Sequence, residues 1–124
     1  MKALIITDGT KFIQSIANLI KESLVGFKTQ ICTAEEFQGT DLLPADVFFI
    51  GCEDSSPASF AYLEELLTHI NLASRKCGVF SIKPKTNKYL LSLLKDCEAE
   101  TWEPLLAENG EVKKTEIKTW LDNL

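Results

Sequence analysis

The sequence alternates short, continuously apolar runs with longer segments in which apolar residues recur every three or four positions. Runs such as Ala3–Ile6 and Val47–Ile50 predict buried strands, whereas the spacing between them predicts amphipathic helices. Strand-helix alternation with short connections requires parallel strands joined by right-handed crossovers. We therefore expect an α/β fold, a five-stranded parallel sheet with helices on both faces.

The expected strands are residues 3–6, 27–32, 47–50, 77–81 and 99–103. Four helices are expected, after strands one, three, four and five. Ser55, Ser56 and Pro57 resemble a helix start, with a serine cap and a proline in the first turn, and Thr86 to Cys97 forms the next helix. Five such strands fit the order 2-1-3-4-5. The length of 124 residues predicts a single domain, residues 1–124.

The charge and the apolar pattern exclude several classes of partner. Lys and Arg total 13 while Asp and Glu total 18, a net charge of −5, so we expect no nucleic-acid partner. No apolar run approaches the roughly 20 residues of a membrane span. Asp8 comes too early for a secretory signal. We expect a cytoplasmic protein that does not bind membranes.

The cysteines and the one histidine give no metal or redox motif. Cys32, Cys52, Cys77 and Cys97 are far apart and form no CxxC pair. We expect buried free thiols at positions 32, 77 and 97, and consider Cys52 separately because it follows a strand. His69 has no titrating partner nearby in the sequence, so no acid-base dyad is expected.

The predicted strand order places a ligand site beyond the carboxyl ends of the strands, between the first and third. Three loops lie there: Thr7–Lys11, Gly51–Pro57 and Ser81–Asn87. The first enters a helix N-terminus, whose free amides favour an anion. Asp8 opposes a bound phosphate, although Lys11 offsets part of its charge. We expect Asp8 to cap the helix, and leave open whether Thr10 caps it or contacts phosphate.

Several strings resemble the flavodoxin family over essentially the whole chain. They are Lys2–Ile6, Asp46–Gly51, Cys77–Ser81 and Trp102–Leu106. The resemblance implies the flavodoxin-like order 2-1-3-4-5 and a small acidic electron carrier that holds FMN without a covalent bond. The family's phosphate loop has the form S/T-x-T-G-x-T. Here the loop is shorter, Thr7-Asp8-Gly9-Thr10-Lys11, with Asp8 where a hydroxyl residue is expected.

The resemblance also implies which residues would hold the cofactor. Thr7, Asp8, Gly9, Thr10 and Lys11 would surround the phosphate, and Gly51, Cys52, Glu53, Asp54, Ser55, Ser81, Ile82 and Lys83 would surround the flavin ring. Flavodoxins usually place an aromatic side chain in a ring loop, and the loop at 51–57 has none. Lys83, Lys85 and Lys88 form a local basic patch, and Tyr89 is expected to pack within its helix.

A receiver domain has the same strand order but different site chemistry. Receivers need an aspartate after the third strand and Lys-Pro after the fifth, where this chain has Gly51-Cys52 and Glu103-Pro104. Catalytic phosphorelay is therefore set aside, and a degenerate receiver that is not phosphorylated is kept as a further alternative. The preferred prediction is FMN binding and electron transfer with a redox partner protein. The alternative is a cofactor-free flavodoxin-like module that binds a protein partner or another anionic ligand.

Overall fold

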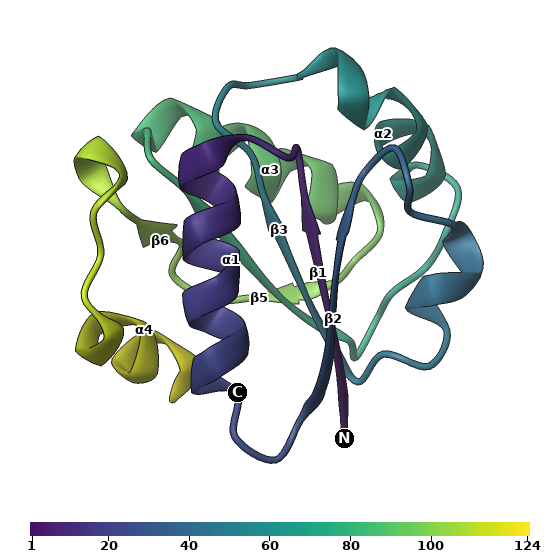
Figure 1. Ribbon diagram of the computed structural model, residues 1–124. Coiled ribbons are helices and arrows are strands. Elements are labelled where there is room, and N and C mark those ends of the chain that lie inside the picture. Colours follow the sequence, from purple (N-terminus) through teal and green to yellow (C-terminus); the bar gives the residue numbers. More distant parts are fainter.

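A computed structural model describes all 124 residues, Met1–Leu124. Figure 1 shows strands at the centre with helices packed around them. None of the helices has the length and apolar character needed to cross a membrane. The elements are β1 (Lys2–Thr7), α1 (Lys11–Ser23), β2 (Lys28–Thr33), η1 (Gly39–Leu42), β3 (Val47–Gly51), η2 (Ala58–Phe60), α2 (Ala61–Leu67), β4 (Lys76–Ser81), α3 (Pro84–Asp96), β5 (Glu100–Thr101), β6 (Leu105–Leu106), η3 (Glu108–Gly110) and α4 (Lys114–Leu121).

The sheet is parallel and has the order β2-β1-β3-β4-β5, which confirms the predicted order. The expected fifth strand at 99–103 is wrong in detail, because it is divided into β5 and β6, both paired with β4. Between them, the Glu103 carbonyl oxygen accepts a hydrogen bond from Trp120 Nε1 at 2.7 Å, and Pro104 has no N–H to donate. The chain therefore leaves the sheet for three residues.

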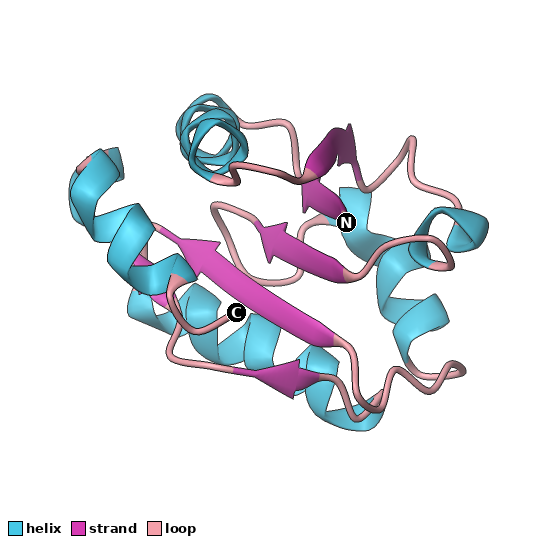
Figure 2. Cartoon of the chain, turned by 90° about the horizontal axis from the view of Figure 1, so that it is seen from below, coloured by secondary structure: helices cyan, strands magenta, loops and turns pink.

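Alternate residues of the buried strands contribute side chains to two hydrophobic cores, one on each face of the sheet. Ile5 and Phe49 face α1 and α4, whereas Phe48 and Ile50 face α2 and α3. Figure 2 shows the helices on both sides of the twisted sheet. Trp102 and Trp120 pack on each other and on Phe49, with 5.3–6.1 Å between ring centroids, so both tryptophans contribute to the core on this face.

Two predicted helix starts are shifted. Ser55–Pro57 does not begin a helix: Pro57 is the N-cap of η2 and α2 starts only at Ala61. Ser56 has a left-handed φ of 48° and its hydroxyl donates to Glu64, so a tertiary contact replaces the expected cap. Helix α3 starts two residues before Thr86, because Pro84 takes its first turn.

The cysteines are free, and their burial departs from expectation at one position. Cys77 and Cys97 are buried, as predicted. Cys52, for which no burial was predicted, is buried as well. Cys32 is only half-buried, because it lies on β2, an edge strand with a single neighbour. His69 is exposed after the end of α2.

Candidate functional site

The three predicted loops meet at the carboxyl edge of the sheet, at the top of Figure 1. Thr7 and Gly51, the last residues of β1 and β3, are partners in the sheet, and Ser81 ends β4. The chain reverses its strand order between β1 and β3, which is where ligands bind in open α/β sheets. The structure therefore places the candidate residues at one edge.

The first loop has only three residues, Asp8 to Thr10, before α1 begins at Lys11. The buried Thr7 hydroxyl donates to Gln14 Oε1 and accepts the N–H of Gly9 at 3.2 Å. Gly9 has a φ of 80°, a left-handed conformation that glycine adopts without steric cost. The Thr7 side chain thus holds the loop against the first turns of the helix.

Asp8 does not cap α1, contrary to expectation. Thr10 is the N-cap residue, and its side chain makes no capping hydrogen bond. Asp8 Oδ1 accepts the N–H of Thr10 at 3.1 Å and its O–H at 2.7 Å, while Oδ2 accepts the N–H of Glu53 at 2.8 Å. The carboxylate closes its own loop and also joins it to the loop after β3.

The second and third loops are joined to each other as well. The Thr86 hydroxyl donates to the Glu53 carbonyl oxygen at 3.1 Å, so the N–H of Glu53 has a partner on the first loop and its carbonyl oxygen has one in the first turn of α3. Lys83 Nζ forms an exposed ion pair with Asp54, and its hydrogen bond to that carboxylate raises the pKa of Lys83. The expected loop Ser81–Asn87 shrinks to Ile82 and Lys83, because α3 starts at Pro84.

Ser81 is turned inward rather than toward solvent. It is fully buried, its hydroxyl lies 2.8 Å from Asn87 Oδ1 and from the Lys83 carbonyl oxygen, and it accepts the N–H of Lys83 at 3.3 Å. These bonds hold the turn from β4 into α3.

Cys52 is a protected thiol. Its side chain is fully buried, and burial, reinforced by the charges of Asp8, Asp54 and Glu64, raises the pKa of Cys52 well above its ordinary value of 9.0. A thiol that stays protonated at neutral pH is a poor nucleophile.

The remaining predicted residues are more open to solvent. Gly9 and Lys11 are exposed, whereas Ser55 and Ile82 are half-buried. Tyr89 packs against the core beside α2, and its hydroxyl donates to Glu64, so a packing role for this ring is confirmed.

Sequence reasoning missed three residues that shape this edge: Gln14, Glu64 and Thr86. Gln14 and Thr86 are polar residues in the first turns of helices that begin at this edge. A polar residue in such a turn is the sequence feature that could have indicated them. Glu64 lies on α2 and accepts hydrogen bonds from Ser56 and Tyr89. No sequence spacing connects it to the site.

Several solved structures that superpose on nearly the whole chain are flavodoxins. A short-chain flavodoxin associated with a bacterial microcompartment superposes with a TM-score of 0.83, covering 100% of this chain and 96% of its own at 14% identity. Flavodoxin 2 of Bacillus cereus superposes with a TM-score of 0.80, covering 97% of this chain and 94% of its own at 20% identity. The chain has a flavodoxin-like fold. No protein-family model matches the sequence, and no curated protein matches it.

The flavodoxin-like edge of this chain does not fit FMN as it is arranged. The N–H of Thr10 and the N–H of Glu53, which face the first loop, already bind the Asp8 carboxylate. The loops expected on either side of the flavin ring are bonded to each other through Thr86 and Lys83. Neither 51–57 nor 81–83 supplies an aromatic ring to stack on a flavin.

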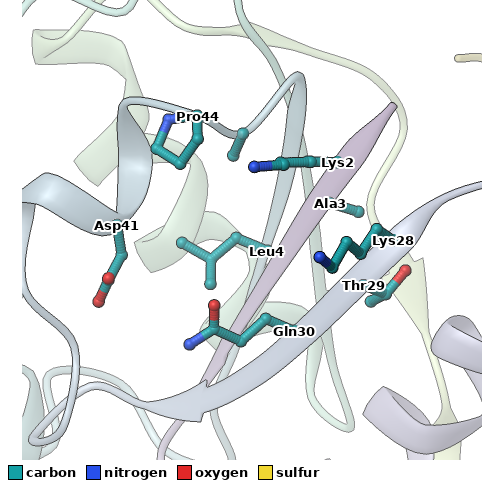
Figure 3. Close-up of a pocket in the computed structure, with 9 residues that line it drawn as sticks. Lys2, Ala3, Leu4, Lys28, Thr29, Gln30, Asp41 and Pro44 are labelled. Carbon is teal, nitrogen blue, oxygen red and sulfur yellow. The ribbon is translucent and has the colours of Figure 1, made fainter.

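A hollow lies at the opposite end of the sheet. It has a volume of about 260 Å³ and is lined by residues of β1, β2, η1 and the segment that follows η1. Figure 3 shows Leu4 and Gln30 projecting from the strands toward the segment that carries Asp41 and Pro44. None of the thirteen predicted site residues lines it.

Proposed function

We propose that this chain is a flavodoxin-fold binding module that works without FMN and docks a protein partner at the carboxyl edge of its sheet. The observation that carries the proposal is the position of Glu53. Its N–H binds Asp8 after β1 and its carbonyl oxygen binds Thr86 on α3. These two bonds close the space between the loops in which a flavin ring would lie.

The charges at this edge favour a basic partner. Acidic side chains outnumber basic ones there: Asp8, Glu35, Glu36, Glu53, Asp54 and Glu64 against Lys11, Lys83, Lys85 and Lys88. Lys83 forms an ion pair with Asp54. Glu35 and Glu36 are exposed beside the closed loops. Such a surface attracts a positively charged partner, and the attraction weakens as salt is added.

A second candidate is the FMN-binding electron carrier expected from the resemblance. It is supported by the overlap with a Fusobacterium nucleatum flavodoxin variant bound to flavin mononucleotide, which covers 98% of this chain at 9% identity with a TM-score of 0.74. The first turn of α1 also keeps free N–H groups beside Lys11. In this second proposal, Thr10 and Lys11 would hold the phosphate.

Titration with FMN separates the two proposals. The purified wild-type protein is mixed with FMN, and flavin fluorescence and the visible spectrum are recorded up to high micromolar protein. The cofactor-free module leaves the fluorescence unquenched and the flavin bands unshifted. Quenching that saturates at one FMN per chain overturns it and supports the carrier.

The docking surface is tested with a lysine-rich peptide as a basic probe. In an NMR titration, amide signals of Glu35, Glu36 and Glu53 should shift, and added salt should reverse the shifts. The double variant Glu35→Gln/Glu36→Gln should bind the peptide more weakly. Replacing two acidic residues on α1 and α4, Glu22→Gln/Glu116→Gln, is the matched control. Equal weakening by both double variants would contradict docking at this edge.

A further inference from the structure

The Asp8 carboxylate is surrounded by donors from two separate parts of the chain. Thr10 provides an N–H and an O–H, and Glu53 provides an N–H from 45 residues further along the chain. Converging backbone N–H groups at a loop that enters a helix are an arrangement that binds anions. In this structure the anion is a side chain of the protein itself.

A purely local role for Asp8 does not account for the third bond. A residue that only shapes its own turn would need Thr10 alone. Oδ2 instead reaches the loop after β3, whose other side is held by Thr86 and Lys83. Asp8 is therefore the one side chain that connects the first loop to the two loops that are already joined.

We propose that the Asp8 carboxylate is a built-in substitute for a ligand phosphate, which satisfies the N–H groups of Thr10 and Glu53 and keeps the three loops closed. This inference rests on the proposed cofactor-free function and explains how the edge is completed without FMN. A phosphate would have to share donors with the Asp8 carboxylate, which is also negatively charged. Two like charges that are both held at hydrogen-bonding distance from the same donors repel each other. Removing the carboxylate frees the donors for an external anion.

The test compares the wild type with Asp8→Ser, which restores a hydroxyl residue, and Asp8→Asn, which keeps the shape and removes the charge. Glu35→Gln is the matched control, because Glu35 is an exposed acidic residue of the same edge that accepts no hydrogen bond and pairs with no lysine. The probe is inorganic phosphate, followed by phosphorus NMR and by the melting temperature against chloride of equal ionic strength. Circular dichroism establishes which variants fold.

Asp8→Ser should bind phosphate at least about tenfold more tightly than the wild type, a difference of one unit in log Kd. Asp8→Asn should also gain affinity, and Glu35→Gln should not. A folded Asp8 variant that binds phosphate no better than the wild type overturns the inference, as does an equal gain in Glu35→Gln. FMN binding by the wild type would refute the proposed function, whereas the phosphate comparison decides the role of Asp8 in either case.

Hydrogen exchange on the wild type gives a measurement that needs no variant. The amide protons of Thr10 and Glu53 should exchange at least about tenfold more slowly than those of Asp54 and Ser55. The N–H groups of Asp54 and Ser55 make no hydrogen bond. Equal exchange rates would show that Asp8 does not hold these donors and would overturn the inference.

Discussion

The ring of Phe80 occupies the space beside Gly51 in which a β-carbon would lie, because a methyl group at position 51 would fall 2.3 Å from ring atom Cε2. The two residues are partners on β3 and β4, at the edge where the loops meet. We predict that Gly51→Ala lowers the free energy of unfolding by about 1–3 kcal/mol, the usual cost of overpacking a core. Urea denaturation measures the loss.

Gly39→Ala is the control for Gly51→Ala. A β-carbon at position 39 would meet its nearest neighbour, Tyr62, at an ordinary 3.4 Å, so its effect on stability should be within about 0.5 kcal/mol. Replacing the ring with a smaller side chain in the double variant Gly51→Ala/Phe80→Leu should recover part of the lost stability, because the two substitutions are coupled through one contact. Strictly additive losses would contradict the steric explanation.

Arg75 fastens the segment between η1 and β3 to the start of β4. Its guanidinium donates to the carbonyl oxygens of Leu42 at 2.6 Å, Ala45 at 3.0 Å and Leu43 at 3.3 Å. We predict that Arg75→Met lowers the free energy of unfolding by about 1–3 kcal/mol, since hydrogen bonds from a charged donor are lost. Thermal unfolding of the variant provides the measurement.

Lys76→Met is the matched comparison, because Lys76 makes a single exposed bond at 3.2 Å to the carbonyl oxygen of Asn123. It should be nearly neutral. Arg75→Lys should fall between Arg75→Met and the wild type, because a lysine cannot form the planar fork that serves several carbonyls. A stability loss of the same size at position 76 would argue against the specific role of Arg75.

The strand order was predictable because each buried strand is a continuous apolar run, and Phe48 and Phe49 supply opposite faces of the sheet without any polar interruption. The break in the last strand was not, because it depends on Trp120 bonding to Glu103 from a helix that follows later. The Ser55–Pro57 signal failed for the same reason. Ser56 bonds to Glu64, and a tertiary contact overrides a local preference.

The edge that carries the candidate site was predictable, but the contacts within it were not. The topology brings Thr7 and Gly51 together whatever side chains surround them. The bond from Glu53 to Asp8 joins residues 45 positions apart, and no sequence spacing indicates it. Asp8 was recognised as an obstacle to phosphate from its charge alone, whereas its use of the backbone donors becomes visible only in three dimensions.

Tyr89 and Glu64 connect α3 to α2 through a hydrogen bond from the phenol to Oε1. We predict that Tyr89→Phe lowers the free energy of unfolding by about 1–2 kcal/mol, since a hydrogen bond to a charged group is lost while the ring remains packed. In the double variant Tyr89→Phe/Glu64→Gln the two losses should not add. Chemical denaturation of the single and double variants measures the coupling, and additive losses would contradict a direct bond.

The four thiols should differ in reactivity with alkylating reagents. Burial, together with the charges of Asp41 and Glu36, raises the pKa of Cys32 from 9.0 to about 11. Only the thiolate reacts, so at about pH 8 native Cys32 should be alkylated roughly 100-fold more slowly than an unperturbed thiol. Cys77 should stay unmodified, because it is fully buried and burial raises its pKa well above the ordinary value.

The raised pKa of Cys32 also predicts how stability depends on pH. Above pH 9 the unfolded chain loses the thiol proton while the folded chain keeps it until about pH 11. Ionisation in that window favours unfolding, so this contribution to stability is complete below pH 9 and is lost as the pH rises. Cys32→Ser should therefore lose less stability between these pH values than the wild type, measured by urea denaturation. Because the other thiols with raised pKa values remain in the variant, its dependence on pH should be reduced rather than abolished, and curves of equal slope would show that Cys32 ionises alike in both states.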